Sequence, residues 1–420
     1  MALLNNAFNN IADIAPEAID ILVNNIVFSR LVSHAYDPAW TKSTGKIGDT
    51  YNIRIPGYFN RVAGAGAVPT GFNDTPVPVT LKQYNSSVLF TSKEMRLNVD
   101  DMKKNVLAPL LEPLWEGMDT DGLALVNSGA VNQFAGLPGT AVTTLTPFLN
   151  AKATIEMLSG KPAAQDCIGI LNPFMQASMV GGLFGTFNPR DTQSEQNLKG
   201  ELGYNGGVHY ASTANIPGFT LGTWTGATPV CPSTVLSSGA SVMSSTGWLP
   251  SSSAVINAGD SFTVQGVYAF NQANRTSTAQ LQQFVCTQTA TSSTGTMVIN
   301  FFPAMIASGP LQNVSAMPVA SAPIYMWSQN GTAPLNTSTG YVSTVSLAFY
   351  EDAFTLAVAD LEDTNGMGGA ESQRIRDPRT KLTLRLTRWY DGIADQGILR
   401  GDLLYGWAQP RPGFACRVMS

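Results

Sequence analysis

The sequence contains few charged residues. Asp, Glu, Lys and Arg together make up 13% of the 420 residues, which is roughly half the usual share for a globular chain. Hydrophobic residues account for 44%, an ordinary proportion for a folded protein. A surface with so little charge favours burial against partners, and the formal net charge of -5 argues against broad basic wrapping of nucleic acid.

Cysteines and long apolar runs are also scarce. The four cysteines are scattered without CxxC spacing, and the N-terminus lacks the pattern of a secretory signal. No apolar run approaches the ~20 residues that a membrane-spanning helix needs. We therefore expect no membrane helix, and free thiols in a reducing cytoplasm, at Cys167, Cys231, Cys286 and Cys416.

The residues and motifs of common catalytic sites are largely missing. His34 and His209 are the only histidines, which leaves few options for a His-rich metal site or a Ser/His/Asp triad. The nucleophile motif GxSxG is missing. The stretch 64–69 lacks the third glycine of the dinucleotide-binding motif GxGxxG, and Gly45-Lys46 lacks the other residues of a phosphate-binding loop. We expect both histidines to be structural and predict no catalytic, metal or cofactor-binding residue.

The first hundred residues predict a helix and two strands. Apolar residues recur at helical spacing from Ile19 to Arg30, with Pro16 in a first helical turn. Alternation then predicts strands over 47–55 and 79–90, separated by a Gly/Pro-rich stretch. Together these strands would make a long hairpin with a loose tip. Because isolated two-stranded ribbons are marginal in water, we expect this hairpin to lie on a neighbouring subunit.

The longest helical pattern runs from Val99 to Val126. Pro109 and Pro113 would each remove a helical hydrogen bond, so we expect a kink there or a later start. Asp119 and Asp121 do not share a helix face at this spacing. We therefore interpret these two carboxylates as solvated or capping groups rather than as a catalytic pair.

The remaining chain predicts an α+β unit interrupted by an all-β insertion. We expect a helix over 150–158, a buried strand over 168–171, and a helix that Asn172-Pro173 opens and that ends near Leu183. From about Gly222 to Met317, Ser, Thr and Gly dominate and lysine is absent, which indicates an inserted module of short strands. A strand or helix over 345–361 and an alternating strand over 381–388 follow.

Three arginines near aromatic residues permit two interpretations. Arg385, Arg388 and Arg400 lie close in sequence to Trp389 and Trp407, a combination that could stack a nucleic-acid strand. Alternation with Leu382, Leu384 and Leu386 instead makes them the polar face of a core strand. We favour the second interpretation.

Several stretches resemble one protein family. They are Asn24-Asn25-Ile26-Val27-Phe28, Gly48-Asp49-Thr50, Gly206-Gly207-Val208-His209-Tyr210, Gly259 to Tyr268, Leu281 to Val285, Ser346 to Phe349 with Asp352-Ala353-Phe354, and Arg400 to Trp407. They resemble the coat proteins of tailed phages with the Hong Kong ninety-seven capsid fold, in the branch of the short-tailed Salmonella phage coat protein. The family often has His and then a basic residue where Tyr350 and Glu351 stand here.

The resemblance implies an α+β phage capsid fold with five parts. These are an N-terminal arm (1–44), an extended hairpin loop (45–92), a peripheral domain with a spine helix (93–149 and 378–420), an axial domain (150–222 and 318–377) and an inserted six-stranded β-barrel (223–317).

The resemblance also implies a function in assembly. The chain would be a major capsid protein, not an enzyme, that forms pentamers and hexamers of an icosahedral shell around double-stranded DNA. Expected partners are further copies, a scaffolding protein and a portal protein, with the virion as location after assembly in the host cytoplasm. Candidate intersubunit contacts are Arg54, Arg61, Lys82 and Glu94. The alternatives are another virion protein, such as a decoration or fibre protein, and a surface hydrolase.

Overall fold

The computed structural model has an α+β architecture with two compact units. Unit 1 comprises residues 1–53, 77–122 and 354–408, and unit 2 comprises residues 54–76, 123–353 and 409–420. Each unit therefore draws on segments distant in sequence. The structure describes residues 11–34, 50–55, 75–91, 106–127, 131–159, 165–183, 202–224, 227–232, 236–250, 254–272, 274–328, 340, 342–366, 370–377 and 380–420.

An antiparallel sheet is the centre of unit 1. Its strand order is β17-β20-β19-β18, and β3 also pairs with β20. Leu384, Leu386, Leu399 and Leu403 are buried at alternate positions along β19 and β20, as expected for strands with one face on a core. The bounds are β3 (Lys82–Thr91), β17 (Thr355–Val358), β18 (Glu371–Arg376), β19 (Thr383–Asp391) and β20 (Gln396–Ala408).

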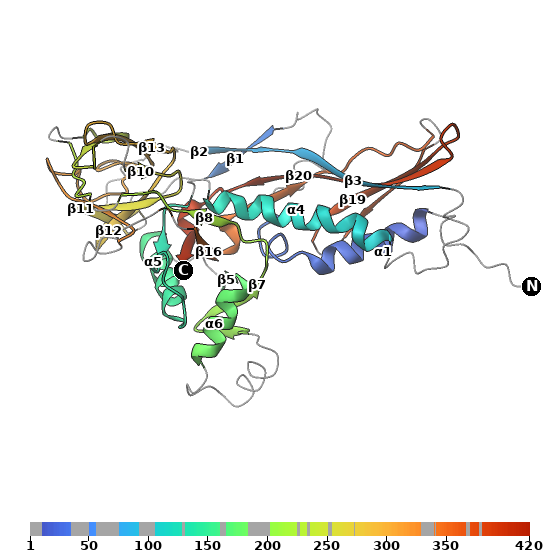
Figure 1. The fold of residues 1–420 in the computed structure, drawn as a ribbon, viewed down its shortest axis with the longest axis horizontal. Coiled ribbons are helices and arrows are strands. Elements are labelled where there is room, and N and C mark those ends of the chain that lie inside the picture. Colours follow the sequence, from blue (N-terminus) through green and yellow to red (C-terminus); the bar gives the residue numbers. More distant parts are fainter. Residues whose placement is uncertain are drawn as a thin grey trace, which may run out of the picture. The chain divides into compact units, whose positions relative to one another are not determined.

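Two helices supply the other layer of unit 1 (Figure 1). Helix α1 (Ile11–Asn25) packs on β18 and β19. Pro16 lies inside α1 rather than in its first turn, and the helix ends at Asn25, so the expected start and the extension to Arg30 are wrong. Helix α4 (Ala108–Asn127) begins later than Val99 in the described residues, with Pro109 in its first turn, where a missing N–H costs no helical bond.

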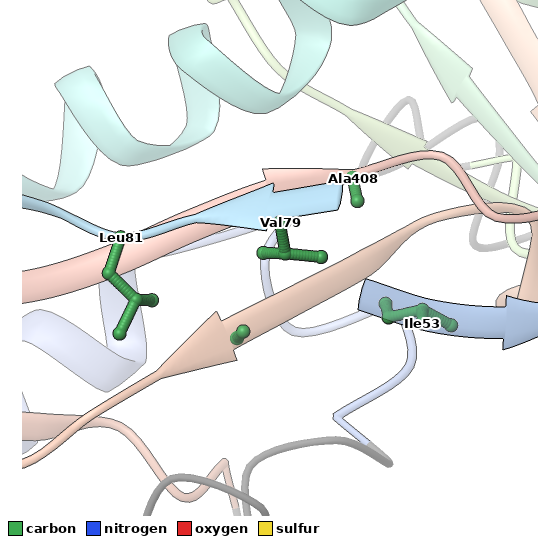
Figure 2. Packing of buried hydrophobic residues seen from close by; sticks show 5 residues of the cluster. Ile53, Val79, Leu81 and Ala408 are labelled. Carbon is green, nitrogen blue, oxygen red and sulfur yellow. The ribbon is translucent and has the colours of Figure 1, made fainter. Parts of the chain in front are cut away.

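The predicted strand over 79–90 is divided at Leu81. Strand β2 (Thr75–Thr80) pairs with β1 (Thr50–Ile55), whereas β3 pairs with β20 along its whole length. Ile53, Val79, Leu81, Ala357 and Ala408 form a buried apolar cluster (Figure 2). The second half of the predicted strand therefore belongs to the sheet of unit 1, because β20 offers it a longer partner than β1 does.

Unit 2 contains a seven-stranded mixed sheet with two helices. The strand order is β4-β21-β16-β5-β7-β6, with β8 paired to β16. Helix α6 (Pro173–Leu183) begins as predicted, and Asn172 Oδ1 accepts a bond from Phe174 N at 2.9 Å. The other bounds are β4 (Phe134–Ala135), α5 (Thr146–Ser159), β5 (Cys167–Leu171), β6 (Tyr204–Asn205), β7 (Val208–Ser212), β8 (Gly218–Thr220), β16 (Val342–Phe349), η3 (Glu351–Ala353) and β21 (Ala415–Met419).

The Ser/Thr-rich part of unit 2 is all-β, as its composition predicts. One sheet has the order β15-β11-β12-β14-β9, and β10 pairs with β13. Segment 228–231 bonds to both edges of the larger sheet, through Val230 N to Thr246 O (2.9 Å) and Ile324 N to Pro229 O (2.9 Å). The bounds are β9 (Ala240–Thr246), β10 (Val255–Ile256), β11 (Ser261–Asn271), β12 (Thr276–Cys286), β13 (Ala290–Thr291), β14 (Thr296–Met305) and β15 (Ile324–Met326).

The cysteines, the helices and the metal-binding side chains of the described residues bear on the expected chemistry. All four cysteines are free, as predicted. All four are also buried, and burial raises the pKa of each thiol. No helix among the described residues is long and apolar enough to span a membrane. Within the same residues, no three His, Cys, Asp or Glu side chains are grouped so that they could hold a metal ion.

Candidate assembly surface

One face of the unit 1 sheet carries a row of arginines. Gly401 and Leu386 are cross-strand partners, and a Cβ on Gly401 would lie 3.4 Å from Leu111 of α4. This face therefore points to the helices, and because side chains alternate along a strand, the residues on either side point away. Among the described residues, the outward set includes four arginines that we call the arginine face: Arg374, Arg376, Arg385 and Arg400.

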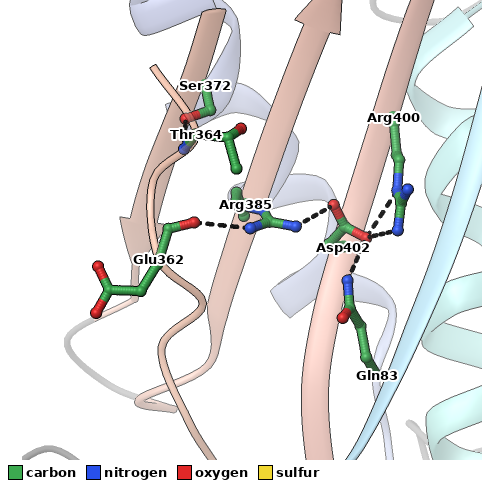
Figure 3. A network of polar contacts seen from close by, with 7 residues as sticks. All are labelled: Gln83, Glu362, Thr364, Ser372, Arg385, Arg400 and Asp402. Atoms are coloured by element: carbon green, nitrogen blue, oxygen red, sulfur yellow. Dashed lines mark hydrogen bonds and ion pairs between the residues drawn. The ribbon is translucent and has the colours of Figure 1, made fainter. Parts of the chain in front are cut away.

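Asp402 holds the arginine face together (Figure 3). Its carboxylate is buried and accepts a bond from Arg385 Nη2 at 3.0 Å, while Arg400 Nη2 lies 2.7 Å from its Oδ1. Gln83 of β3 donates to the same oxygen at 3.0 Å. Three strands thus converge on one carboxylate. Bonds between ionised groups in a buried setting are stronger and more directional than neutral ones, so the two guanidinium groups are held in place.

The second layer of polar contacts fixes the edge of this face. Arg385 Nη1 donates to the carbonyl oxygen of Glu362 at 2.7 Å, and Thr364 N donates to Ser372 Oγ at 2.8 Å (Figure 3). Thr383 Oγ1 donates to Asp360 Oδ1 at 2.7 Å. The chain that follows β17 is therefore tied across β19 and β18, which makes the arginine face a preorganised surface.

Apolar side chains extend the same face toward the β19–β20 turn. Leu89, Ile398 and Trp389 are cross-strand partners on β3, β20 and β19, two residues beyond the row that contains Arg400. Leu89 is 59% exposed, and Ile393 in the turn itself is 99% exposed. A cluster of exposed large apolar groups beside arginines has the composition of a protein interface.

The two helices of unit 1 carry acidic but no basic side chains. Neither α1 nor α4 contains Lys or Arg. Four acidic side chains on the two helices are exposed, and we call them the acidic helix face: Glu17, Asp20, Glu112 and Glu116. The helical side of unit 1 therefore carries four exposed carboxylates and the sheet side carries the arginine face, although Lys82 and Arg388 also lie on the helical side by their strand register.

The structure places the predicted contact residues as follows. Arg54 is exposed on β1 and Lys82 is exposed at the start of β3, on the side that faces the helices rather than on the arginine face. Arg61 and Glu94 lie outside the described residues. Contacts of these four residues with another subunit stay a prediction.

The two histidines and Asp121 take part in no grouped site among the described residues. His34 Nε2 lies 2.9 Å from the carbonyl oxygen of Ser29, and burial lowers the pKa of His34. His209 is exposed on β7. Asp121 accepts a bond from Tyr405 Oη at 2.8 Å.

Asp119 is buried, so of the two expected roles, solvated or capping, only the capping role applies to this residue. Its oxygens accept bonds from the backbone N–H groups of Val27, Phe28 and Ser29 at 2.8, 3.1 and 2.9 Å. Asp119 therefore caps the turn after α1. The capped backbone lies 90 residues earlier in the sequence, so a local sequence pattern could not identify this role.

Asp402 is the residue that sequence reasoning missed on the arginine face. The alternation of Leu384 and Leu386 predicted that Arg385, Arg388 and Arg400 lie on the polar face of a core strand. This is confirmed for Arg385 and Arg400, but it is wrong for Arg388, which pairs with the buried Leu399 on the side that faces the helices. The signal for Asp402 was a lone acid, two residues after Arg400, between the apolar pairs 398–399 and 403–404. A buried carboxylate needs hydrogen-bond donors or a charged partner, and Arg385 and Arg400 supply both to Asp402.

Unit 2 contains a second buried polar centre. Asp260 accepts bonds from Asn257 N (2.8 Å), Gly222 N (3.0 Å) and Trp327 Nε1 (3.3 Å). Burial raises the pKa of Asp260 to about 7. Arg417 is fully buried nearby, and burial lowers the pKa of its guanidinium to about 10. This centre is part of the core rather than a reaction site, because neither side chain is exposed.

Comparisons with known proteins give structural likeness only. No protein-family model matches the sequence, and no curated protein matches it. Among solved structures, the chain is similar to the mature capsid of bacteriophage PhiM1 (10% identity, 94% of this chain, 86% of that chain, TM-score 0.43). It is also similar to the capsid of cyanophage P-SCSP1u (11% identity, 94% of this chain, 87% of that chain, TM-score 0.43). A third similar structure is the capsid of cyanophage Pam1 (9% identity, 93% of this chain, 88% of that chain, TM-score 0.43). A likeness at this level assigns neither a family nor a function.

Proposed function

We propose that this chain is the major capsid protein of a tailed bacteriophage. Many copies would form the pentamers and hexamers of an icosahedral shell that encloses double-stranded DNA. The observations that support the proposal best are the arginine face on the sheet of unit 1 and the acidic helix face on its two helices.

Each side suits one requirement of a shell. The arginine face, with Leu89 and Ile393 exposed beside it, has the apolar and arginine content of a surface that another copy covers. The acidic helix face would point to the interior. Phosphates bind to Lys and Arg, so a lining of carboxylates would enclose DNA without gripping it.

The five parts expected from the sequence belong to this proposal. They are an N-terminal arm, an extended loop, a peripheral domain, an axial domain and an inserted β-barrel, with the limits 1–44, 45–92, 93–149 with 378–420, 150–222 with 318–377, and 223–317. The segment 228–231 that joins both edges of the all-β sheet supports a barrel, and the long helix α4 supports a spine.

The proposal includes partners and place of action. A scaffolding protein would guide assembly in the host cytoplasm, a portal protein would occupy one vertex, and the mature chain would reside in the virion. Arg54, Arg61, Lys82 and Glu94 would contact neighbouring copies. As a structural subunit of the shell, the chain would perform no catalysis.

Negative-stain electron microscopy of the full chain, expressed alone and together with the neighbouring scaffold gene, tests this function. Closed shells under either condition are the expected result. A monodisperse monomer or trimer under both conditions would contradict it and favour a fibre or decoration protein. Hydrolase activity that disappears in His209→Ala would instead support the enzyme alternative.

A further inference from the structure

Unit 2 contains a pocket of about 180 Å³ whose lining is uncharged. It lies where the all-β strands meet the end of α5, at Leu158, and the turn η5 (Pro412–Phe414). Asn271 Nδ2 donates to Met157 O at 3.0 Å beside it and ties β11 to α5. The pocket walls therefore come from segments that direct hydrogen bonds hold together.

Amide side chains provide the polar part of the lining. Three of them are buried, Asn132, Gln133 and Gln282. Asn132 Nδ2 donates to Gln283 O at 2.9 Å, and Gln282 Nε2 donates to the same oxygen at 3.1 Å. An amide has two N–H donors and an oxygen acceptor, so one bond fixes each group without exhausting it. The amides of the lining are Asn132, Gln133, Gln272, Gln282 and Asn313.

Rings provide the apolar part of the lining. The phenyl groups of Phe270 and Phe302 line the pocket together with Pro303 and Pro412. The face of an aromatic ring carries partial negative charge and attracts the weakly positive C–H groups of a ligand. A ligand that fits would therefore combine hydroxyl groups for the amides with a C–H face for the rings.

The absence of charge among the described lining residues excludes several ligand classes. The nearby cation Arg275 lies 5.4 Å from the centre of the Phe270 ring, but its Nη1 donates to Gly309 O at 2.9 Å. A phosphate, carboxylate or metal ion in the pocket would lose hydration without gaining a charged partner, which is unfavourable.

We propose that this pocket binds a neutral, polyhydroxylated ring, that is, a monosaccharide unit of a glycan. Its volume is below the ~300–1,000 Å³ of sites for drug-sized ligands, which suits one sugar ring better than an extended peptide. The fixed amides supply donors and acceptors for neighbouring hydroxyl groups, and the phenyl groups supply the stacking surface. This inference does not depend on shell formation.

Saturation-transfer NMR on the full chain tests the proposal, with the methyl glycosides of glucose, galactose, mannose and N-acetylglucosamine as probes. The wild type should show transfer to at least one glycoside. Gln272→Ala and Gln282→Leu should each weaken binding about five- to tenfold, because each removes a hydrogen-bonding amide. Gln288→Ala is the matched control, since this amide bonds to Asn300 at 3.1 Å on the exposed surface and does not line the pocket.

Thermal unfolding of each variant separates loss of binding from loss of fold. Gln272 is only half-buried, so its variant should unfold at the wild-type temperature even if the Gln282 variant does not. Absence of transfer to all four glycosides would overturn the proposal. So would wild-type binding by both pocket variants, or binding of a proline-rich peptide where no glycoside binds.

Discussion

Arg417 Nη1 donates a 2.7 Å hydrogen bond to the carbonyl oxygen of Gly259, a residue 158 positions earlier in the chain. The same guanidinium donates to Ser261 Oγ and lies 5.2 Å from the ring centre of Trp327. The C-terminal strand β21 is thereby tied to the first residues of β11. Because Arg417 and Asp260 are both buried, this tie is part of the core of unit 2.

Replacement of Arg417 should destabilise the protein strongly. Arg417→Met removes the buried cation nearest to Asp260 and should lower the free energy of unfolding by about 3–5 kcal/mol, measured by urea unfolding above the pKa of Asp260. Arg411→Met is the control, because Arg411 is only half-buried and should lose less than about 1 kcal/mol. Equal losses in the two variants would contradict a role for the buried pair.

The raised pKa of Asp260 predicts a pH dependence of stability. Between the ordinary pKa of 3.8 and the folded value of about 7, the folded chain retains a proton that the unfolded chain has lost. The free energy of unfolding should therefore fall as pH rises through this window, by roughly 1.4 kcal/mol per unit from this group. The difference between the wild type and Asp260→Asn across that window isolates the group. A difference that stays constant with pH would show that Asp260 does not titrate there.

Two glycines of α4 should respond in opposite ways to alanine. A Cβ on Gly122 would lie 2.6 Å from the Trp407 ring and 2.8 Å from the Phe28 ring, so Gly122→Ala should cost about 1–3 kcal/mol. A Cβ on Gly117 meets nothing within 4 Å, so Gly117→Ala should stabilise the helix by about 0.5–1 kcal/mol. Urea unfolding of both variants checks the sign. Stabilisation by Gly122→Ala would mean that α4 does not pack closely on Trp407.

Charge reversal on the arginine face should block assembly without unfolding the chain. Arg374 is exposed, so Arg374→Glu should change stability by less than about 0.5 kcal/mol. It should nevertheless prevent shell formation, because a reversed charge would no longer complement the neighbouring copy that covers this face. Arg30→Glu makes the same change of charge at an exposed site outside this face and should assemble normally. Sedimentation of the wild type, Arg374→Glu and Arg30→Glu measures assembly. Equal assembly of all three would show that the arginine face is not an assembly contact.

The sequence predicted those elements whose signals are local. Asn172-Pro173 identified the start of α6, and alternation identified β19 together with the outward side of Arg385. The change in composition near Gly222 identified the all-β part. In each case, the residues that determine the structure are neighbours in the chain.

Long-range partners were not predictable in the same way. The pairing of β3 with β20 joins residues more than 300 positions apart, as in the bond of Gln83 to Asp402. The burial of Asp119 depends on backbone groups at 27–29. Such features depend on which segments meet in the fold, and periodicity within a single segment carries no information about its partner.

The most direct measurement is a cryo-electron microscopy reconstruction of the assembled particle, with this chain fitted into it. We predict a closed shell in which a neighbouring copy covers Arg374 and Leu89, while Glu112 and Glu116 face the interior. A shell in which the arginine face lines the DNA, or a particle in which the chain builds a fibre, would contradict it.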